Sequence, residues 1–278
     1  MLRITFLLRR NSDRTREEFQ EYWRRTHGPL VASFGTALRA RRYVQVHSVD
    51  DPVNAAMAAA RGGMEDPYDG VAELWWDDEE TFAGAVSSSE GQEASAALLE
   101  DESRFIDLPN SPLWLSHEYP QVNPTPENLL ARPRNPLVKL YYPLRRRGEL
   151  SEENAQLYWR TNHGPLIRSQ AMASGILRYV QVHRFPHPAE QAMREARGVQ
   201  VETYMGHAEL WFDRRHLGGD HPEAQAAGAR AIADEGKFID FSRSVSYTHL
   251  RAHETRYVIS YAVFCLKRGG GGGGGGGG

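Results

Sequence analysis

The nonapeptide YWRRTHGPL at residues 22–30 returns as YWRTNHGPL at residues 158–166. Two further blocks recur at the same offset of 136 residues, namely RYVQVH (42–47 and 178–183) and GVAELWWD, which returns as GHAELWFD (70–77 and 206–213). A repeat of this length is a complete small domain. A chain with two copies can therefore form within itself an interface for which a single copy would need a partner.

Each copy has the same predicted order of elements, which the first copy illustrates. A strand at 2–8 precedes a helix, and Thr15 with Glu18 has the capping-box pattern that starts one. Apolar residues at helical spacing continue to Gly28 and Pro29, which we expect to end the helix. The copy is completed by strands at 42–47, 71–76 and 112–119 and by helices at 53–61 and before residue 102. This order predicts an α+β fold, with two tandem ferredoxin-like domains that carry helices on one face of each sheet.

The domain boundaries follow from proline and glycine. Five prolines within residues 120–136 indicate a stiff linker, so we expect a first domain at 1–119 and a second at 137–244. Residues 245–278 have no counterpart in the first copy, end in ten glycines at 269–278, and resemble translated sequencing-adapter read-through. We expect them to be a non-native, disordered tail in place of the closing strand of the second copy. A genuine flexible glycine-rich tail is the alternative.

The composition excludes several classes of protein. The chain has 33 Lys and Arg against 36 Asp and Glu, a formal net charge of −3, and no basic block that would favour a nucleic-acid partner or an acidic membrane. The only cysteine, Cys265, lies in the suspect tail, so disulfides, thiolate metal sites and a cysteine nucleophile are not expected. No run of 18 apolar residues and no signal peptide is found, and we expect a soluble, cytoplasmic protein.

Strand alternation separates two faces of each predicted sheet. We expect Val44, Val46, Ala72 and Leu74 to pack on the helices. The opposite face is mixed and has two large aromatic side chains in each copy. It comprises Tyr43, Gln45, His47, Glu73 and Trp75, with Tyr179, Gln181, His183, His207, Glu209 and Trp211 in the second copy. A solvated face is the alternative, but exposed apolar patches usually mark interaction sites, so we expect the two faces to meet and enclose a cavity.

These motifs resemble the EthD-domain family of the dimeric α/β-barrel superfamily. The resemblance rests on the Tyr-Trp-x-x-x-His-Gly-Pro-Leu block, the Arg-Tyr-Val-Gln-x-His strand, the segment YDGVAELW at 68–75 and the Phe-Ile-Asp block near the end of each copy, and it covers 2–119 and 137–244. It implies that two ferredoxin-like units pair their sheets into a barrel, here within one chain. Relatives in the superfamily include cofactor-independent monooxygenases, lactone isomerases, cyclases and dehydratases. Some distant groups bind haem, and the EthD domain is usually grouped with oxidoreductases.

Four residues are candidates for catalysis. His27 and His163 each lie four residues after a Trp at the expected end of a helix, where the helix dipole favours a protonated imidazole and suits a proton donor. A structural histidine is the alternative. Glu73 and Glu209 lie beside a Trp on the cavity face, where burial would raise the carboxyl pKa toward that of a general acid or base. The alternative for them is an ion pair with a neighbouring arginine.

The rest of the mixed face is a candidate surface for substrate binding. Its members are Tyr43, Gln45, His47, Trp75, Tyr179, Gln181, His183, His207 and Trp211. No His-Glu-x-x-His spacing, nucleotide fingerprint or nucleophile elbow occurs, so we expect no metal and no cofactor.

The leading hypothesis is a cofactor-independent enzyme in an intrachain pseudo-dimer, with further homo-oligomerisation left open. It would oxidise, dehydrate or isomerise a small apolar or aromatic oxygenated metabolite in the barrel cavity. The alternatives are a non-catalytic binding protein for such a small molecule and a haem-dependent oxidoreductase.

The interpretation of the tail predicts what the gene encodes beyond codon 244. We expect the genomic sequence to continue into a strand resembling residues 112–119, because the first copy closes with that strand. Sequencing the genomic locus tests this expectation, and a locus that encodes residues 245–278 as they stand would establish the tail as natural.

Overall fold

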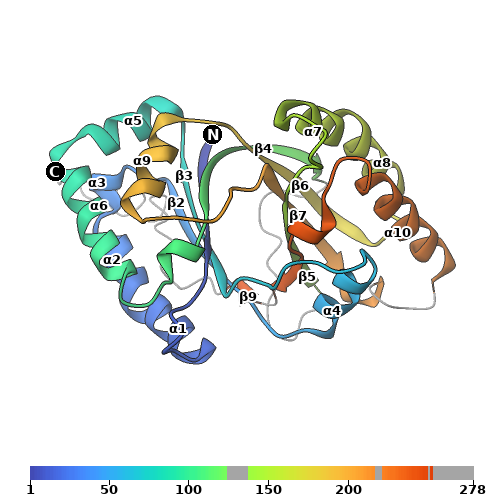
Figure 1. Ribbon diagram of the computed structural model, residues 1–278, viewed down its shortest axis with the longest axis horizontal. Helices are drawn as coiled ribbons and strands as arrows, with labels where there is room; N and C mark the ends of the chain where they lie inside the picture. The colour runs from blue at the N-terminus through green and yellow to red at the C-terminus, as the bar shows by residue number, and fades with distance from the viewer. Residues whose placement is uncertain (124–136, 217–220, 250, 253–278) are drawn as a thin grey trace, which may run out of the picture.

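The computed structural model describes residues 1–123, 137–216, 221–249 and 251–252. It consists of two halves of similar construction whose strands form one continuous sheet, with the helices on its outer side (Figure 1). Every strand pairing in the described sheet is antiparallel. The predicted α+β fold of two tandem ferredoxin-like domains is therefore confirmed.

The first half contains β1 (Leu2–Leu8), α1 (Arg16–Tyr22), a π-helical turn (Trp23–His27), α2 (Gly28–Ser33), α3 (Gly35–Leu38), β2 (Arg42–His47), α4 (Pro52–Ala59), β3 (Gly70–Trp76), α5 (Glu79–Ser87), α6 (Ser89–Glu102) and β4 (Leu113–Val122). The second half contains β5 (Leu137–Leu144), α7 (Glu152–Tyr158), a π-helical turn (Trp159–His163), α8 (Gly164–Gln170), β6 (Ile176–Arg184), α9 (Pro188–Ala196), β7 (Gly206–Asp213), α10 (Pro222–Glu235), β8 (Tyr247–His249) and β9 (Arg251–Ala252). Strand β4 runs beyond the linker boundary expected at residue 120, and residues 124–136 of that linker lie outside the described residues.

The strand order β8-β5-β7-β6-β4-β1-β3-β2-β9 shows how the halves join. Strand β4 pairs with β1 of its own half and with β6 of the other half. At the opposite seam, β8 pairs with β5 and β9 pairs with β2. Since β8 and β9 are consecutive in the chain, one segment joins the two ends of the sheet and closes it into the predicted intrachain barrel.

The position of β8 and β9 differs from the expectation that the second half lacks a closing strand. Residues 247–249 and 251–252 take the place that β4 has in the first half, although their sequence does not resemble that of β4. Ladder pairing uses backbone N–H and C=O groups, which every residue except proline supplies, so an unrelated sequence can fill this position. Residues 250 and 253–278 of the expected tail lie outside the described residues.

The assignment of β2 to the two faces of the sheet was wrong. Tyr43 lies opposite Leu74 and Val44 lies opposite Glu73 in the β2–β3 ladder, so Val44 shares the face of Glu73 and Tyr43 does not. Tyr43 packs with the helices of the first half. Val46 belongs instead to the cluster that fills the barrel.

The barrel is filled by side chains from both halves. Leu7, Val46 and Trp114 of the first half pack there against Tyr141 and Tyr204 of the second. The two inner faces therefore meet, as predicted. These side chains pack against one another as a hydrophobic cluster.

The helix that follows β1 begins as predicted and ends later than predicted. Thr15 and Glu18 form both hydrogen bonds of the capping box. At Gly28 and Pro29 the chain continues from a π-helical turn directly into α2, which corrects the expectation that these residues end the helix. Proline has no N–H and its ring crowds the carbonyl four residues earlier, and a widened turn relieves that crowding. His27 therefore lies inside a helical run and not at a helix C-terminus.

A buried hydrogen-bond network ties this turn to β2. The amide of Gln45 donates to the carbonyl oxygen of Trp23 at 2.8 Å, and the indole of Trp23 donates to the hydroxyl of Tyr43 at 3.0 Å. The imidazole of His47 lies 3.2 Å from the side-chain oxygen of Gln45. A Cβ at Gly28 would lie 2.9 Å from the amide nitrogen of Gln45, so glycine permits this close approach.

The second half repeats the network with the same residue types. Gln181 donates to the carbonyl of Trp159 at 2.9 Å, Trp159 donates to Tyr179 at 2.7 Å, and His183 lies 3.0 Å from Gln181. Burial lowers the pKa of His183 to about 3, which keeps its imidazole neutral. These strand residues, which recur in both copies, thus hold the helix against the sheet.

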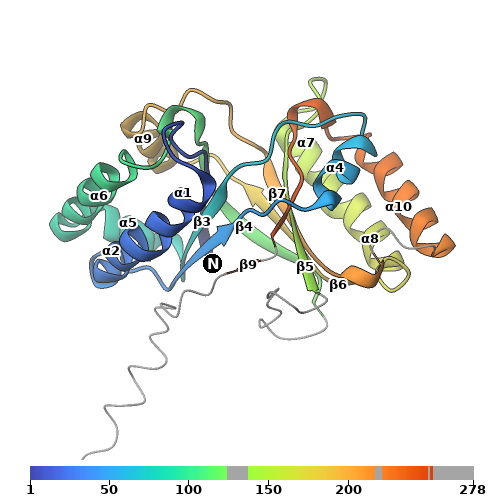
Figure 2. The same cartoon turned by 90° about the horizontal axis from the view of Figure 1, so that it is seen from below.

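The two halves exchange one helix each. In Figures 1 and 2, α4 of the first half lies on the side of the second half, near α10, and α9 of the second half lies beside the helices of the first. Met57 of α4 packs against the second core, and Met193 of α9 packs against the first. Each half therefore completes the other outside the barrel as well as inside it.

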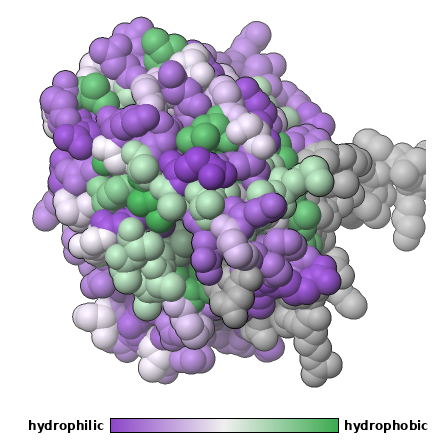
Figure 3. All heavy atoms as spheres, turned by 90° about the vertical axis from the view of Figure 1, so that its right-hand side faces the viewer, coloured by the Kyte–Doolittle hydropathy of each residue, from purple (hydrophilic) through white to green (hydrophobic). Residues whose placement is uncertain are grey.

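The outer helices of the second half present a largely hydrophilic surface, with smaller groups of hydrophobic side chains between (Figure 3). Leu157 and Met172 are exposed large hydrophobic residues in this half. Single exposed apolar side chains are common on protein surfaces. None of the helices in the described ranges is both long and apolar enough to cross a membrane.

The network predicts a structural cost for removing its glutamine. Gln181→Leu should lower the free energy of unfolding by about 1–3 kcal/mol, because His183 and Tyr179 lose buried hydrogen-bond partners. Urea denaturation measures this change. Gln191→Leu on the exposed side of α9 is the matched control, with an expected change below about 0.5 kcal/mol. A Gln181→Leu protein of unaltered stability would contradict this role.

Candidate functional site

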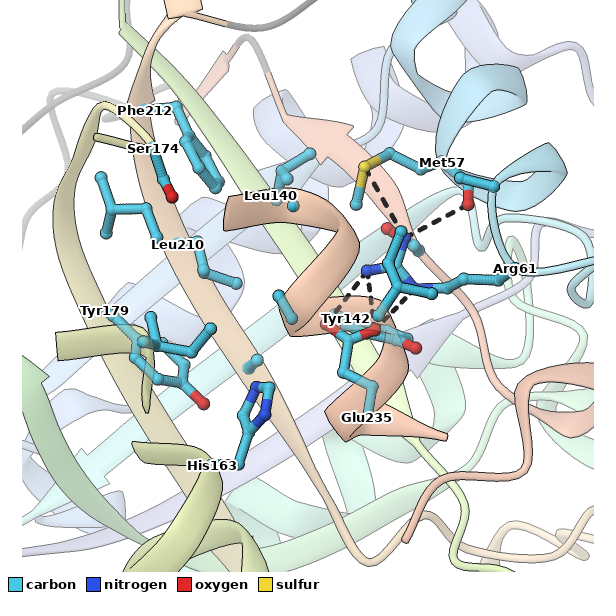
Figure 4. Close-up of a pocket in the computed structure, with 18 of the residues that line it drawn as sticks. Met57, Arg61, Leu140, Tyr142, His163, Ser174, Tyr179, Leu210, Phe212 and Glu235 are labelled. Carbon is cyan, nitrogen blue, oxygen red and sulfur yellow. Dashed lines mark hydrogen bonds and ion pairs between the residues drawn. The ribbon is translucent and has the colours of Figure 1, made fainter. Parts of the chain in front are cut away.

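Each half has a cavity between the outer face of its sheet and its helices. The second-half cavity has a volume of about 190 Å³ and is lined by Tyr142, His163, Ser174, Tyr179 and Phe212, among others (Figure 4). The first-half cavity has a volume of about 140 Å³ and is lined by Phe6, His27, Leu38, Tyr43 and Trp76, among others. Both of these cavities lie outside the barrel, on the face that carries His27 and His163.

His163 is oriented by a buried carboxylate. Its Nδ1 lies 2.9 Å from Oδ2 of Asp234, whose Oδ1 accepts hydrogen bonds from Tyr158 at 2.7 Å and from Lys237 at 2.9 Å. Burial opposes ionisation of Asp234, but hydrogen bonds from Tyr158, Lys237 and His163 outweigh it and lower the pKa of this carboxyl group. An ionised Asp234 accepts a hydrogen bond from Nδ1–H of His163, so in the neutral ring Nε2 has the free lone pair.

The first half contains the same arrangement. Nδ1 of His27 lies 2.8 Å from Oδ2 of Asp101, and the hydroxyl of Tyr22 donates to Oδ1 at 2.7 Å. The hydrogen bond from His27 lowers the pKa of Asp101. Both predicted histidines therefore lie on cavity walls, and each is held by a hydrogen bond to an aspartate of a neighbouring helix.

The exchanged helices supply the roofs of the cavities. Arg61, just after α4, donates to Glu235 of α10 through Nε at 2.8 Å and through Nη2 at 3.1 Å (Figure 4). Its guanidinium group lies over the ring of Tyr142 at 4.9 Å. A bidentate, buried pair of this kind fixes both side chains in one orientation.

The opposite roof has the matching contacts. Arg197, just after α9, donates to Glu102 through Nε at 2.9 Å and through Nη2 at 3.2 Å, and lies over the ring of Phe6 at 5.4 Å. Neither cavity is complete without the other half of the chain.

The predicted acid–base residues Glu73 and Glu209 lie in the barrel, away from both cavities. The guanidinium group of Arg3, which is 1% exposed, pairs with both carboxylates and with Glu118, the last at 2.9 Å. Lys139 adds a pair to Glu209 at 3.1 Å. The ion-pair alternative for the two glutamates is thus what the structure shows, with Arg3 as the partner.

The barrel cluster also contains the candidates His207, Trp75 and Trp211. His207 lies 3.2 Å from Glu209 and stacks on Tyr141, and burial lowers its pKa to about 3. Trp75 donates to Glu118 at 2.7 Å. The ligand atoms of Glu73, His207 and Glu209 lie within 4.8 Å of one another, close enough to hold a metal ion. Arg3 and Lys139 already balance these carboxylates, which disfavours a further cation there.

The predicted binding residues therefore separate into three groups. Tyr43 and Tyr179 line the two cavities. Gln45, His47, Gln181 and His183 lie behind them in the structural networks. Trp75, His207 and Trp211 lie in the barrel.

Sequence reasoning missed the carboxylates that complete the cavities, Asp101 with Glu102 and Asp234 with Glu235. A signal for them exists. An Asp-Glu pair precedes the Phe-Ile-Asp block at the same spacing in both copies.

Comparison with known proteins gives a family and distant structural likenesses. Residues 11–109 and 147–242 match the profile of the EthD domain. No curated protein matches the sequence. The structure is similar to that of a provisionally assigned monooxygenase from Lactobacillus acidophilus, with 9% identity, a TM-score of 0.41 and coverage of 90% of this chain and 93% of that chain. For a provisionally assigned monooxygenase from Fusobacterium nucleatum the identity is 6%, the TM-score 0.46, and the coverage 90% and 92%.

The barrel cluster predicts a pH dependence of stability. Burial raises the pKa of Glu73 from 4.5 to about 7, so between these values the folded protein binds a proton that the unfolded chain releases. The stabilisation of the folded state by this protonated Glu73 is therefore complete below pH 4.5 and is lost as the pH rises through 7. We expect the stability of the parent protein relative to Glu73→Gln to fall by about 3 kcal/mol between pH 4.5 and 8.

Urea denaturation of both proteins across this pH range measures the difference. The effect of His183 is common to both proteins and cancels, because this imidazole lies in the network behind the helices and not in the barrel cluster. A difference that stays flat or rises with pH would mean that Glu73 is ionised throughout.

Proposed function

The chain belongs to the EthD-domain family, with one domain in each half, and we propose that it is an enzyme that transfers a proton to or from a small, ring-shaped, oxygenated molecule held in the second-half cavity. His163 is the proposed acid–base group, and Asp234 is its positioning residue. The observation that carries the proposal is the His163–Asp234 dyad, whose imidazole lies in the wall of a largely apolar cavity.

The dyad supports proton transfer for a specific reason. A carboxylate on Nδ1 fixes the tautomer and orientation of the imidazole and stabilises the imidazolium that forms when Nε2 accepts a proton. Removal of a proton from a hydroxyl group, or from a carbon next to a carbonyl, begins isomerisation and dehydration, and also cofactor-independent oxidation by O₂. Proton transfer is thus the first step that oxidation, dehydration and isomerisation share, and these are the three reactions expected from the sequence.

The cavity limits the size and polarity of the substrate. An apolar cavity of about 150 Å³ can hold benzene, and the second-half cavity measures about 190 Å³. Leu140, Leu210 and Phe212 give it apolar walls, and His163 and Ser174 bring polar groups to it. A single substituted ring fits this combination. A haem group does not, because a porphyrin is far larger than the cavity.

Glu73 and Glu209 have a structural role in this proposal. Their carboxylates are buried against Arg3 in the barrel, and a substrate in either cavity would not contact them. The non-catalytic binding protein is the second candidate function. It is favoured by the bonds that Tyr158 and Lys237 make to Asp234, since these would hold the carboxylate in place without any reaction.

The proposal predicts the effect of removing the imidazole. His163→Gln should lower kcat/KM by about 10²–10⁴-fold with little change in ligand affinity, because the base is lost and the cavity walls remain. Asp234→Asn should lower it at least tenfold and shift the pH profile, because the tautomer and the imidazolium lose their support.

The measurement begins with quenching of tryptophan fluorescence by a panel of small phenols and lactones, since Trp159 lines the cavity. Compounds that bind are then followed for product formation by mass spectrometry. His221→Asn on the surface before α10 is the control for histidine replacement. Binding that never gives product would favour the binding protein, and full turnover by His163→Gln would reject the assigned base.

A further inference from the structure

The two cavities differ at matched positions of their walls. At the offset of 136 residues, Phe6 in the first-half cavity corresponds to Tyr142 in the second, and Leu38 corresponds to Ser174. Both changes replace an apolar side chain of the first half by a hydroxyl-bearing one. At these two positions the wall of the second-half cavity is the more polar, although both cavities have the same His–Asp dyad and the same Arg–Glu roof. The first-half cavity has a hydroxyl of its own in Ser95, but this group donates to the carbonyl of Gly91 at 2.7 Å.

Ser174 brings a hydroxyl group to the second-half cavity away from His163. Figure 4 shows it beside Phe212, at the other end of the cavity from the imidazole. Within the described ranges its hydroxyl makes no hydrogen bond, and only its backbone N–H is paired, to the carbonyl of Gln170 at 3.0 Å. An unpaired hydroxyl in the wall favours a ligand with a polar group at that end.

Tyr142, unlike Ser174, already has a partner within the protein. Its ring lies under the guanidinium group of Arg61. Burial raises the pKa of Tyr142 well above its ordinary value, so its hydroxyl stays protonated. The first-half cavity has Phe6 under Arg197 instead. Its smaller volume, about 140 Å³ against about 190 Å³, also leaves less room for substituents.

We propose that the first-half cavity is a second ligand site, with a narrower specificity than the second. It takes a ring with one polar substituent, which lies at His27, and an apolar group against Leu38. The second-half cavity also takes a ring with two polar substituents, one at His163 and one at Ser174. The placement of the first polar group beside each histidine rests on the proposed function.

The chemistry gives the expected discrimination. A second hydroxyl group placed against Leu38 would lose its hydrogen bonds to water without replacement, whereas Ser174 can pair with it. An unpaired buried hydroxyl weakens binding about tenfold to a hundredfold. p-Cresol and hydroquinone are suitable probes, because they differ only by a methyl and a hydroxyl group at the position opposite the phenol.

Fluorine NMR of protein labelled with 5-fluorotryptophan tests the proposal, since Trp23 lines the first-half cavity and Trp159 the second. Trp23→Phe and Trp159→Phe assign the two resonances. We expect p-cresol to shift both resonances at similar concentrations. Hydroquinone is kept reduced under argon. It should shift the resonance of Trp159 at concentrations at least tenfold lower than those needed to shift the resonance of Trp23.

Matched variants identify the residues responsible. Ser174→Leu should weaken the binding of hydroquinone detected at Trp159 at least tenfold and should change the affinity for p-cresol by no more than about threefold. Leu38→Ser should strengthen the binding of hydroquinone detected at Trp23. If Ser174→Leu disturbs folding, Ser174→Ala is the alternative variant that removes the hydroxyl group. Equal preference of both cavities for the two probes, or no shift of Trp23 with p-cresol, would overturn the proposal. Both readouts measure binding, so they are independent of whether His163→Gln retains turnover.

Discussion

The buried charge of Arg3 is the constraint on which the rest of the structure depends. Its guanidinium group is 1% exposed and pairs with Glu73 and Glu118 of its own half and with Glu209 of the other. A charge in such surroundings is tolerated only while its partners are in place, and loss of one partner from a buried pair typically costs about 3–5 kcal/mol. Separation of the halves would remove Glu209 and expose the aromatic core of the barrel, so the barrel and its two outer layers form together.

The same closure shapes the two cavities. Arg3, Lys139 and large aromatic side chains lie in the barrel, and the two apolar cavities lie between the sheet and the helices. These spaces are roofed by exchanged helices, whose ends are held by Arg61 with Glu235 and by Arg197 with Glu102. A substrate in either cavity would therefore contact both halves, and any shift between the halves would change the cavity shape.

The sequence predicted the repeat, the capping box and the paired sheets because these depend on local spacing and on identity between copies. It misplaced Tyr43 and Gln45 because both faces of β2 are buried. Hydrophobic alternation identifies a core face only when the other face meets water. Here the valines face the barrel and the polar residues form a network against Trp23. His27 was found from its motif. The repeated Asp-Glu pair marks Asp101 as a candidate, but its contact with His27 depends on how two helices pack, 74 residues apart in the chain.

Fusion of two copies in one chain permits differences that a symmetric dimer forbids. In a dimer of identical chains, a change in one cavity or at one end of the barrel occurs in both. Here Arg3 corresponds to Lys139, Val71 to His207 and Leu38 to Ser174, so both the barrel and the cavities have lost the symmetry. Arginine and lysine carry the same charge but differ in shape and in the number of hydrogen bonds that they donate. The guanidinium group of Arg3 pairs with both Glu73 and Glu209, whereas the ammonium group of Lys139 pairs with Glu209. The asymmetry of the barrel thus changes the geometry of its ion pairs without changing their total charge, and the cavities differ between the halves in the same way, by single side chains at matched positions.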